Sequence, residues 1–311
     1  MIHMSLLKAA FYNPQLLDCD KPVLPVSSLC QEIHINAMHC DLYNKIVNWK
    51  LGLASVIHPN YLQVLTLPMQ LEMMVNKPFP FKPMGLVHLA NHIKINWLPE
   101  QNSKLMLKTS FNGLTWHKQG WVFAVLSEGF VNGKLAVSGT SYYLSRRKHA
   151  HSNDSQNIIH DINSSQLVQR PENQSFVMPS LNAVASPFDN TCELNFPIGV
   201  GRKYATVSGD FNPIHLTRWT AKLMGFRQAI AHGMYSKALC LSAVVKQEMQ
   251  NSKWVLAQTP MQFSTQFMQP IYLPTCCELK VNRHLNLIDF SLTSQSRCKE
   301  REHLRTNIVI G

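Results

Sequence analysis

The stretch that decides the fold is Tyr204–Met234, YATVSGDFNPIHLTRWTAKLMGFRQAIAHGM. It places Asp210 and His215 five residues apart, on either side of Pro213. Gly209 and Pro213 disfavour a continuous helix, so we predict a loop that directs both side chains toward one cleft. The closing letters AHGM open an apolar run with helical spacing, which predicts that a helix begins near the end of this stretch.

The run that begins this helix has a counterpart in the first half of the chain. Residues 231–239, AHGMYSKAL, align with residues 57–65, IHPNYLQVL, so that the His, the Tyr and the final Leu coincide at an offset of 174 (232 − 58). Residues 272–274, YLP, align with residues 97–99, WLP, at an offset of 175 (274 − 99). Two nearly equal offsets predict a duplicated fold.

Each half is predicted to consist of a helix followed by strands. Residues 60–75 are apolar on most sides, as in a helix wrapped by other structure, and Pro68 should kink this helix or shift its start. In the second half, Met234 begins a run with apolar residues at i, i+4, i+7 and i+11. The predicted strands are 86–98, 104–111, 121–130, 134–144, 262–268, 278–283, 287–293 and 304–310, with Asn112-Gly113 and Asn132-Gly133 as hairpin turns. This order predicts an α+β fold in which each sheet wraps around its helix.

A polar segment at residues 146–176, poor in aromatic residues, divides the two halves. We interpret it as a linker between an N-terminal domain at 1–145 and a C-terminal domain at 177–311. Across all 311 residues the hydrophobic content is 45%, enough for a sizeable core, and the net charge is +11. Such a surplus favours an acidic partner, but the absence of any Lys/Arg block of five argues against nucleic acid.

The eight cysteines form no Cys-x-x-Cys pair and show no zinc-type spacing, which predicts reduced thiols packed as small apolar side chains. The first residues lack the basic start and the long apolar core of a signal peptide, so no signal peptide is predicted. No apolar run reaches about 18 residues, so no membrane span is expected. We therefore expect a cytoplasmic protein.

The pair Asp210 and His215 suits acid/base work on a water molecule. Their ordinary pKa values, about 3.9 and 6.5, are well separated, so one group can take a proton while the other gives one. Asn212 can orient the pair by hydrogen bonding. If the helix begins near Met234, the Gly233 N–H lies among its unpaired N-terminal donors, which favour a developing negative charge.

Plainer interpretations stay open for these residues. Asp210 could cap a helix within an ordinary Asx-rich turn. His232 is interpreted first as a structural residue, because its counterpart His58 lies in a half that lacks an acid/base pair. His88 and His92 are four residues apart and could suggest metal ligation, but on a predicted strand they would simply share one face, so we predict no metal site.

The motif YATVSGDFNPIH at 204–215, followed by IAHGM at 230–234, resembles the signature of the (R)-specific enoyl-CoA hydratases of the MaoC-like dehydratase family. The segment Gln266–Pro274 is similar to the strand that follows in that family. The two-half arrangement resembles its double hot-dog members, which implies two long helices, each wrapped by an antiparallel sheet, packed as a pseudo-dimer. In such members the N-half has lost its catalytic residues and shapes the acyl tunnel.

The resemblance implies a hydro-lyase that reversibly adds water to trans-2-enoyl thioesters to give (R)-3-hydroxyacyl thioesters. It gives catalytic roles to Asp210 and His215, an orienting role to Asn212 and the oxyanion N–H to Gly233, with His232 and Ser242 as substrate-binding candidates. Some single hot-dog relatives place a Ser eight residues after the Gly. This chain has Leu241 at that position, and Ser242 is a candidate because it comes next. Coenzyme A or acyl carrier protein would be part of the substrate, and no separate cofactor is expected.

Two further expectations follow from the duplication. The offset of 174 places Asn36 and Asp41 at the positions of Asp210 and His215, and neither residue type matches, so one active site per chain is predicted. A homodimer stays open, although the internal duplication could replace the dimer that single hot dogs need. The alternatives to a hydratase are a module that binds acyl thioesters without turnover and a thioesterase on the same fold.

Overall fold

The structure is a computed structural model that describes residues 9, 12, 14, 22–49, 57–76, 78–146, 181, 188, 190–251, 260–296 and 299–311. The predicted linker, apart from Arg146, lies outside these residues, so the domain boundaries stay a prediction. No helix among the described residues is long and apolar enough to cross a membrane.

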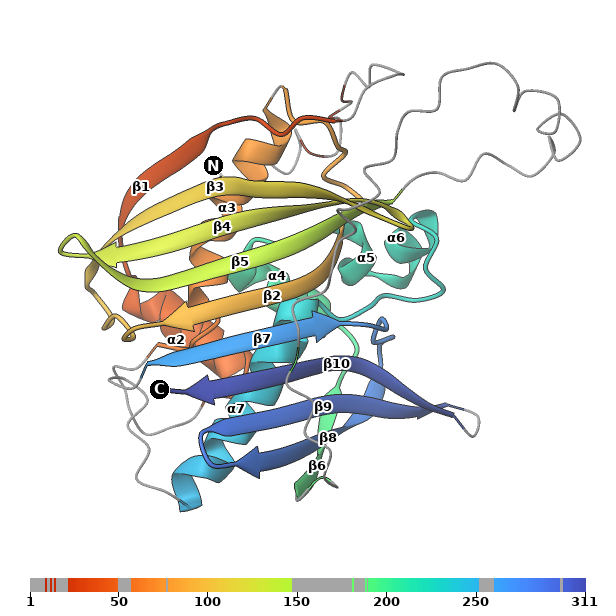
Figure 1. The fold of residues 1–311 in the computed structure, drawn as a ribbon. Helices are drawn as coiled ribbons and strands as arrows, with labels where there is room; N and C mark the ends of the chain where they lie inside the picture. The colour runs from red at the N-terminus through yellow and green to blue at the C-terminus, as the bar shows by residue number, and fades with distance from the viewer. Residues whose placement is uncertain are drawn as a thin grey trace, which may run out of the picture.

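One continuous antiparallel sheet organises the molecule (Figure 1). Its strands run in the order β1-β3-β4-β5-β2-β7-β10-β9-β8-β6. The first five are β1 (Ser28–His34), β2 (Val87–Ile95), β3 (Lys104–His117), β4 (Gly120–Val131) and β5 (Lys134–Arg146). The others are β6 (Asn190–Phe196), β7 (Met261–Phe267), β8 (Thr275–His284), β9 (Leu287–Ser296) and β10 (Lys299–Ile310). The order of the second five mirrors that of the first, as the duplication predicts.

Two long helices lie against one face of this sheet, one for each half (Figure 1). They are α3 (Tyr61–Val75) and α7 (Gly233–Asn251), and both match the predicted helices. Pro68 lies inside α3 and does not shift its start, because the helix already begins at Tyr61. Among the residues that the structure describes, the shorter helices are α2 (Ala37–Ile46), α4 (Val200–Ser208), α5 (Pro213–Leu216) and α6 (Arg218–Leu223). The α+β prediction is therefore confirmed.

The halves meet along β2 and β7, which pair antiparallel from Ala90 with Gln266 to Ile95 with Met261. Beneath this seam one hydrophobic cluster extends through both halves. It includes the rings of Tyr43 from α2 and Tyr204 from α4, which are tilted by 53° with their centroids 6.2 Å apart. The two halves are therefore packed as one body around a shared core.

Several strand limits differ from the sequence prediction for identifiable reasons. Asn112-Gly113 is not a hairpin turn but a β-bulge within β3, where the pairing with β4 shifts between Phe111 and Leu114 and Gly113 takes φ +94°. Asn132-Gly133 does form the predicted turn, with positive φ at both residues. The strands β1 and β6 and the helices α2 and α4 were missed, because short half-exposed segments such as β1 show no clear period.

A buried lysine joins the two halves behind the seam. Lys237 of α7 is fully buried, and its Nζ donates to Oδ1 of Asn91 on β2 at 2.6 Å. Asn91 in turn donates to Ser141 Oγ on β5 at 3.1 Å. Burial lowers the pKa of Lys237 from 10.5 to about 7, so the native state bears the cost of burying this amine when it is charged.

The free energy of unfolding is therefore expected to rise with pH between about 7 and 10.5. Below this window Lys237 is charged in both states and the full cost is present, whereas above it the amine is neutral in both and the cost is gone. Within this window, Lys237 contributes a slope of up to about 1.4 kcal/mol per pH unit to the free energy of unfolding. Denaturant unfolding at several pH values measures it, and Lys237→Met should flatten the slope; equal slopes in both proteins would contradict the assignment.

Candidate active site

The loop between α4 and α5 positions the acidic residue of the predicted pair. Helix α4 ends at Ser208 and is capped by Gly209, which takes the left-handed conformation with φ +74° and turns the chain so that Asp210 leaves the helix. The Asn212 main-chain N–H donates to Asp210 Oδ1 at 3.2 Å, and the Asn212 side chain caps α5 by accepting from the Ile214 N–H. Asn212 thus orients Asp210 through its backbone, and the Asx-type turn weighed above is present.

The basic residue of the pair comes from α5, which packs closely on α4. His215 lies in this short helix rather than in an irregular loop, and it is 8% exposed. Its Nδ1 lies 2.8 Å from the carbonyl oxygen of Ile230. Because a carbonyl only accepts, Nδ1 carries the proton and Nε2 is left with a lone pair. His215 can therefore accept a proton through Nε2.

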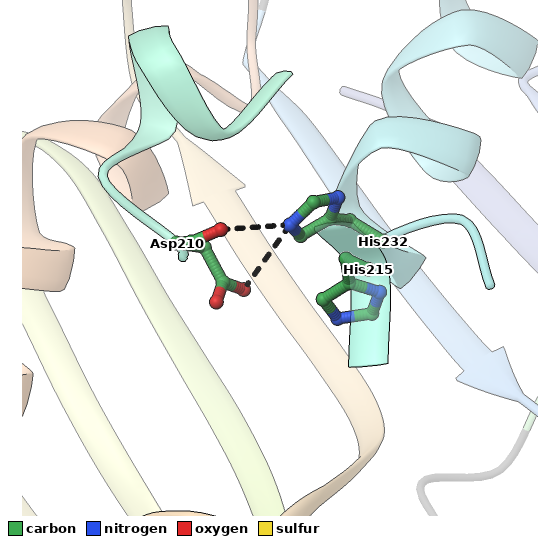
Figure 2. A group of neighbouring side chains, drawn as sticks. All are labelled: Asp210, His215 and His232. Atoms are coloured by element: carbon green, nitrogen blue, oxygen red, sulfur yellow. Dashed lines mark hydrogen bonds and ion pairs between the residues drawn. The ribbon is translucent and has the colours of Figure 1, made fainter. Parts of the chain in front are cut away.

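Three side chains gather at this point (Figure 2). The rings of His215 and His232 stack with their centroids 3.7 Å apart, and His232 Nε2 donates to the main-chain oxygen of Asp210 at 2.9 Å. The same nitrogen lies 3.9 Å from Asp210 Oδ2. His232 is 2% exposed, so the structure places it beneath the pair as a support for Asp210. A contact between His232 and substrate stays a prediction.

The charges of the pair follow from these surroundings. Burial tends to raise the pKa of Asp210, but the imidazoles of His232 and His215 and the Asn212 N–H outweigh it, and the net direction is downward. Burial is also the main reason that the pKa of His215 falls to about 3, and His232 adds to it. At neutral pH Asp210 is therefore a carboxylate and His215 a neutral imidazole, two acceptors at one place.

Within the part of the chain that the structure describes, the same three residues form a group that could hold a metal ion. One ligand atom from each of Asp210, His215 and His232 lies within 4.8 Å of the others. However, His215 Nδ1 and His232 Nε2 are already engaged with main-chain oxygens, which leaves one ring nitrogen on each. Second-shell bonds of this kind orient imidazoles for proton transfer as well as for metals. The expectation of no metal stays a prediction.

The N-terminus of α7 presents the Gly233 N–H, which the sequence analysis predicted as the oxyanion donor. Helix α7 begins at Gly233, so the Gly233 N–H is one of the first-turn donors that no helical carbonyl reaches. A Cβ at residue 233 would lie 3.1 Å from the Phe267 ring. A glycine at this position leaves room for a substrate carbonyl to approach the backbone N–H. Ser242 lies nine residues further along the same helix, about 13 Å by helical rise, and is buried. The structure does not bring Ser242 to the pair.

The N-half contributes a wall that the sequence analysis missed. His88 of β2 packs on the Phe267 ring at 4.9 Å and on the Tyr143 ring at 4.7 Å, and the charge of Asp210 acts on both His88 and Tyr143. The expectation that His88 and His92 share a face is wrong, because a β-bulge between His88 and Ala90 shifts the register. His92 instead lies with its Nδ1 2.8 Å from Ser264 Oγ on β7. The bulge gave no sequence signal.

The pseudo-equivalent positions in the N-half show no comparable pair. Asn36 caps α2 by accepting from the His39 N–H at 3.0 Å, and Asp41 accepts from Gln101 at the surface. His58, the counterpart of His232, is buried and lies with Nε2 3.2 Å from the Ala238 carbonyl on α7. The N-half histidine therefore binds the backbone of the opposite half.

Comparison with known proteins bears directly on this geometry. The family model described as MaoC like domain matches residues 201–286, which run from the second residue of α4 through β8 and include all the residues placed above in the C-half. This part of the chain is therefore similar to MaoC-like domains. A relative, 3-hydroxyacyl-thioester dehydratase X of Mycobacterium tuberculosis, is 24% identical over 280 residues, which are 89% of this chain and 87% of that protein.

Solved structures show the same architecture over nearly the whole chain. HtdX of Mycobacterium tuberculosis has a TM-score of 0.68 at 22% identity, and the match covers 91% of this chain and 99% of that one. A MaoC-like dehydratase from Phytophthora capsici has a TM-score of 0.71 at 16% identity, with 93% and 96% covered. A Mycobacterium tuberculosis protein described as a double hot-dog fold has a TM-score of 0.55 at 11% identity, with 93% and 97% covered. The fold is thus a double hot dog.

Proposed function

We propose that this protein is a hydro-lyase that interconverts trans-2-enoyl and (R)-3-hydroxyacyl thioesters. The observation that supports this most directly is the meeting of Asp210 and His215, two proton acceptors, beside the N-terminus of α7. Its relative in Mycobacterium tuberculosis is named as a dehydratase of 3-hydroxyacyl thioesters. The MaoC-like domain and this name both agree with water addition and removal.

The geometry accounts for each part of the proposed reaction. A water molecule can donate one hydrogen to Asp210 and the other to His215 Nε2, which leaves a lone pair of its oxygen for C3. As the C3–O bond forms, the C2=C3 electrons move toward the thioester carbonyl, and the Gly233 N–H stabilises the resulting oxyanion, an effect worth roughly 2.7–4 kcal/mol for one such donor. The proton lost by the water returns to C2 from the acceptor that took it, so addition is syn.

The experiment that tests this function follows the ultraviolet absorbance of the conjugated enoyl thioester after mixing with crotonyl-CoA and longer enoyl-CoAs. Loss of absorbance without release of free thiol, with the (R)-alcohol as product, is the expected result, and it should persist in the presence of EDTA. Thiol release would identify a thioesterase instead. Binding without turnover at every chain length would identify an acyl-thioester-binding module.

The pH dependence of kcat/KM offers a second measurement. Because the pKa of His215 falls to about 3 and that of Asp210 is also lowered, both groups keep their charge state from about pH 5 to 8. We expect a flat profile across this range and a loss only toward lower pH, where His215 and Asp210 gain protons. An acid limb centred near the ordinary histidine value of about 6.5 would show that His215 is not held in this way.

A further inference from the structure

A surface cleft of about 600 Å³ lies beside the wall of the active site. Three segments line it: the segment after α6, the connection between β7 and β8, and the first residues of β10. The side chains used in the argument below are Arg227, Tyr272, Glu300, Arg301 and Glu302. In Figure 1 these connections gather at the end of the sheet where α5 and α6 lie.

Main-chain pairing connects the cleft to the catalytic segment. Tyr272 forms an antiparallel bridge with Ile230, and the N–H groups of Ala231 and Leu273 extend this pairing at 2.9 Å to Ile271 and Ala229. Ile230 is the residue whose carbonyl receives Nδ1–H of His215. In this short antiparallel pairing, one segment contains Tyr272, which lines the cleft, and the other contains Ile230, which binds His215.

The cleft is lined by the guanidinium groups of Arg227 and Arg301. The two carboxylates that also line it form salt bridges with other cations. The carboxylate of Glu300 pairs with Lys280, and that of Glu302 pairs with Arg305 at 2.9 Å, and neither cation lines the cleft. Among the salt bridges formed by the described residues, none includes Arg227 or Arg301. The Arg227 guanidinium lies over the Tyr272 ring at 4.1 Å, which holds it at the cleft.

We propose that this cleft binds the phosphate groups of coenzyme A, with Arg227 and Arg301 as their ligands. This inference rests on the proposed function, because it assigns the carrier end of the same thioester. A guanidinium fork matches two phosphate oxygens, and the net charge of +11 draws a polyanion toward the protein. A thioester whose carbonyl lies at Gly233 has its phosphates at the far end of the pantetheine arm, outside the catalytic pair, and a surface cleft beside the active site can receive them.

The test compares a thioester that carries the phosphates and adenosine of coenzyme A with one that lacks both. Crotonyl-CoA carries them and crotonyl-pantetheine does not. The double variant Arg227→Ala/Arg301→Ala should raise KM for crotonyl-CoA by about tenfold or more, since hydrogen bonds to charged groups are among the stronger ones, and should leave KM for crotonyl-pantetheine and both kcat values unchanged. Lys118→Ala/Lys134→Ala removes the same charge from exposed positions of the N-half and should change neither KM.

Direct binding of free coenzyme A by calorimetry separates this inference from the proposed function. If no thioester is hydrated but coenzyme A binds the unaltered protein and not the arginine variant, the function fails and the cleft assignment stands. If crotonyl-CoA is hydrated with the same KM in both proteins, the cleft assignment is overturned and the function stands. An equal rise in KM for both thioesters, or an equal effect of the lysine variant, also overturns it.

Discussion

Asp210→Asn is expected to lower kcat for enoyl thioester hydration by about 10²–10⁴-fold, the usual contribution of a positioned acid/base group. The amide is nearly the same size and can still accept at Oδ1 from the Asn212 N–H. It cannot take a proton from the water or carry the negative charge that the two imidazoles favour. The loss should therefore appear in kcat, with the fold and KM for the thioester largely retained.

A matched control for this variant lies in the other half of the chain. Asp41 occupies the position that the offset of 174 pairs with His215, and its carboxylate accepts from Gln101 at the surface. Asp41→Asn makes the same chemical change there and should leave kcat within about twofold, as expected for a residue that contributes no acid/base step. Equal losses in both variants would show that the effect does not come from the proposed pair. Circular dichroism and thermal unfolding establish that both variants are folded.

The sequence predicted the parts of this molecule that depend on local patterns. The helices α3 and α7 were found from their apolar runs, and the motif at 204–215 predicted that Asp210 and His215 are directed toward one place. What the sequence did not show depends on contacts between distant segments. The bulge in β2 turns His88 inward and His92 away, and the stack of His215 on His232 arises only when α5 meets the start of α7. Neither leaves a periodic signal.

Gly201→Ala is expected to have the second large effect, through the contact between α4 and α5. In most helices this change stabilises by roughly 1 kcal/mol, because alanine has the higher helix propensity. Here the added Cβ would lie 2.0 Å from the main-chain oxygen of His215 and 3.0 Å from its carbonyl carbon. Both neighbours are backbone atoms, so no side chain can rotate away, and α4 and α5 must separate.

That separation moves the two members of the pair relative to each other, since Asp210 follows α4 and His215 lies in α5. We expect a loss of about 1–3 kcal/mol in the free energy of unfolding from overpacking, and a fall in kcat of about 10²-fold for a displacement near 1 Å. Gly225→Ala is the comparison, because its Cβ would meet nothing within 4 Å and only its positive φ of 85° is strained. It should cost stability without costing kcat. If Gly201→Ala instead stabilises the protein and keeps full activity, α4 does not hold His215 in place, and the pair must be positioned by the start of α7 alone.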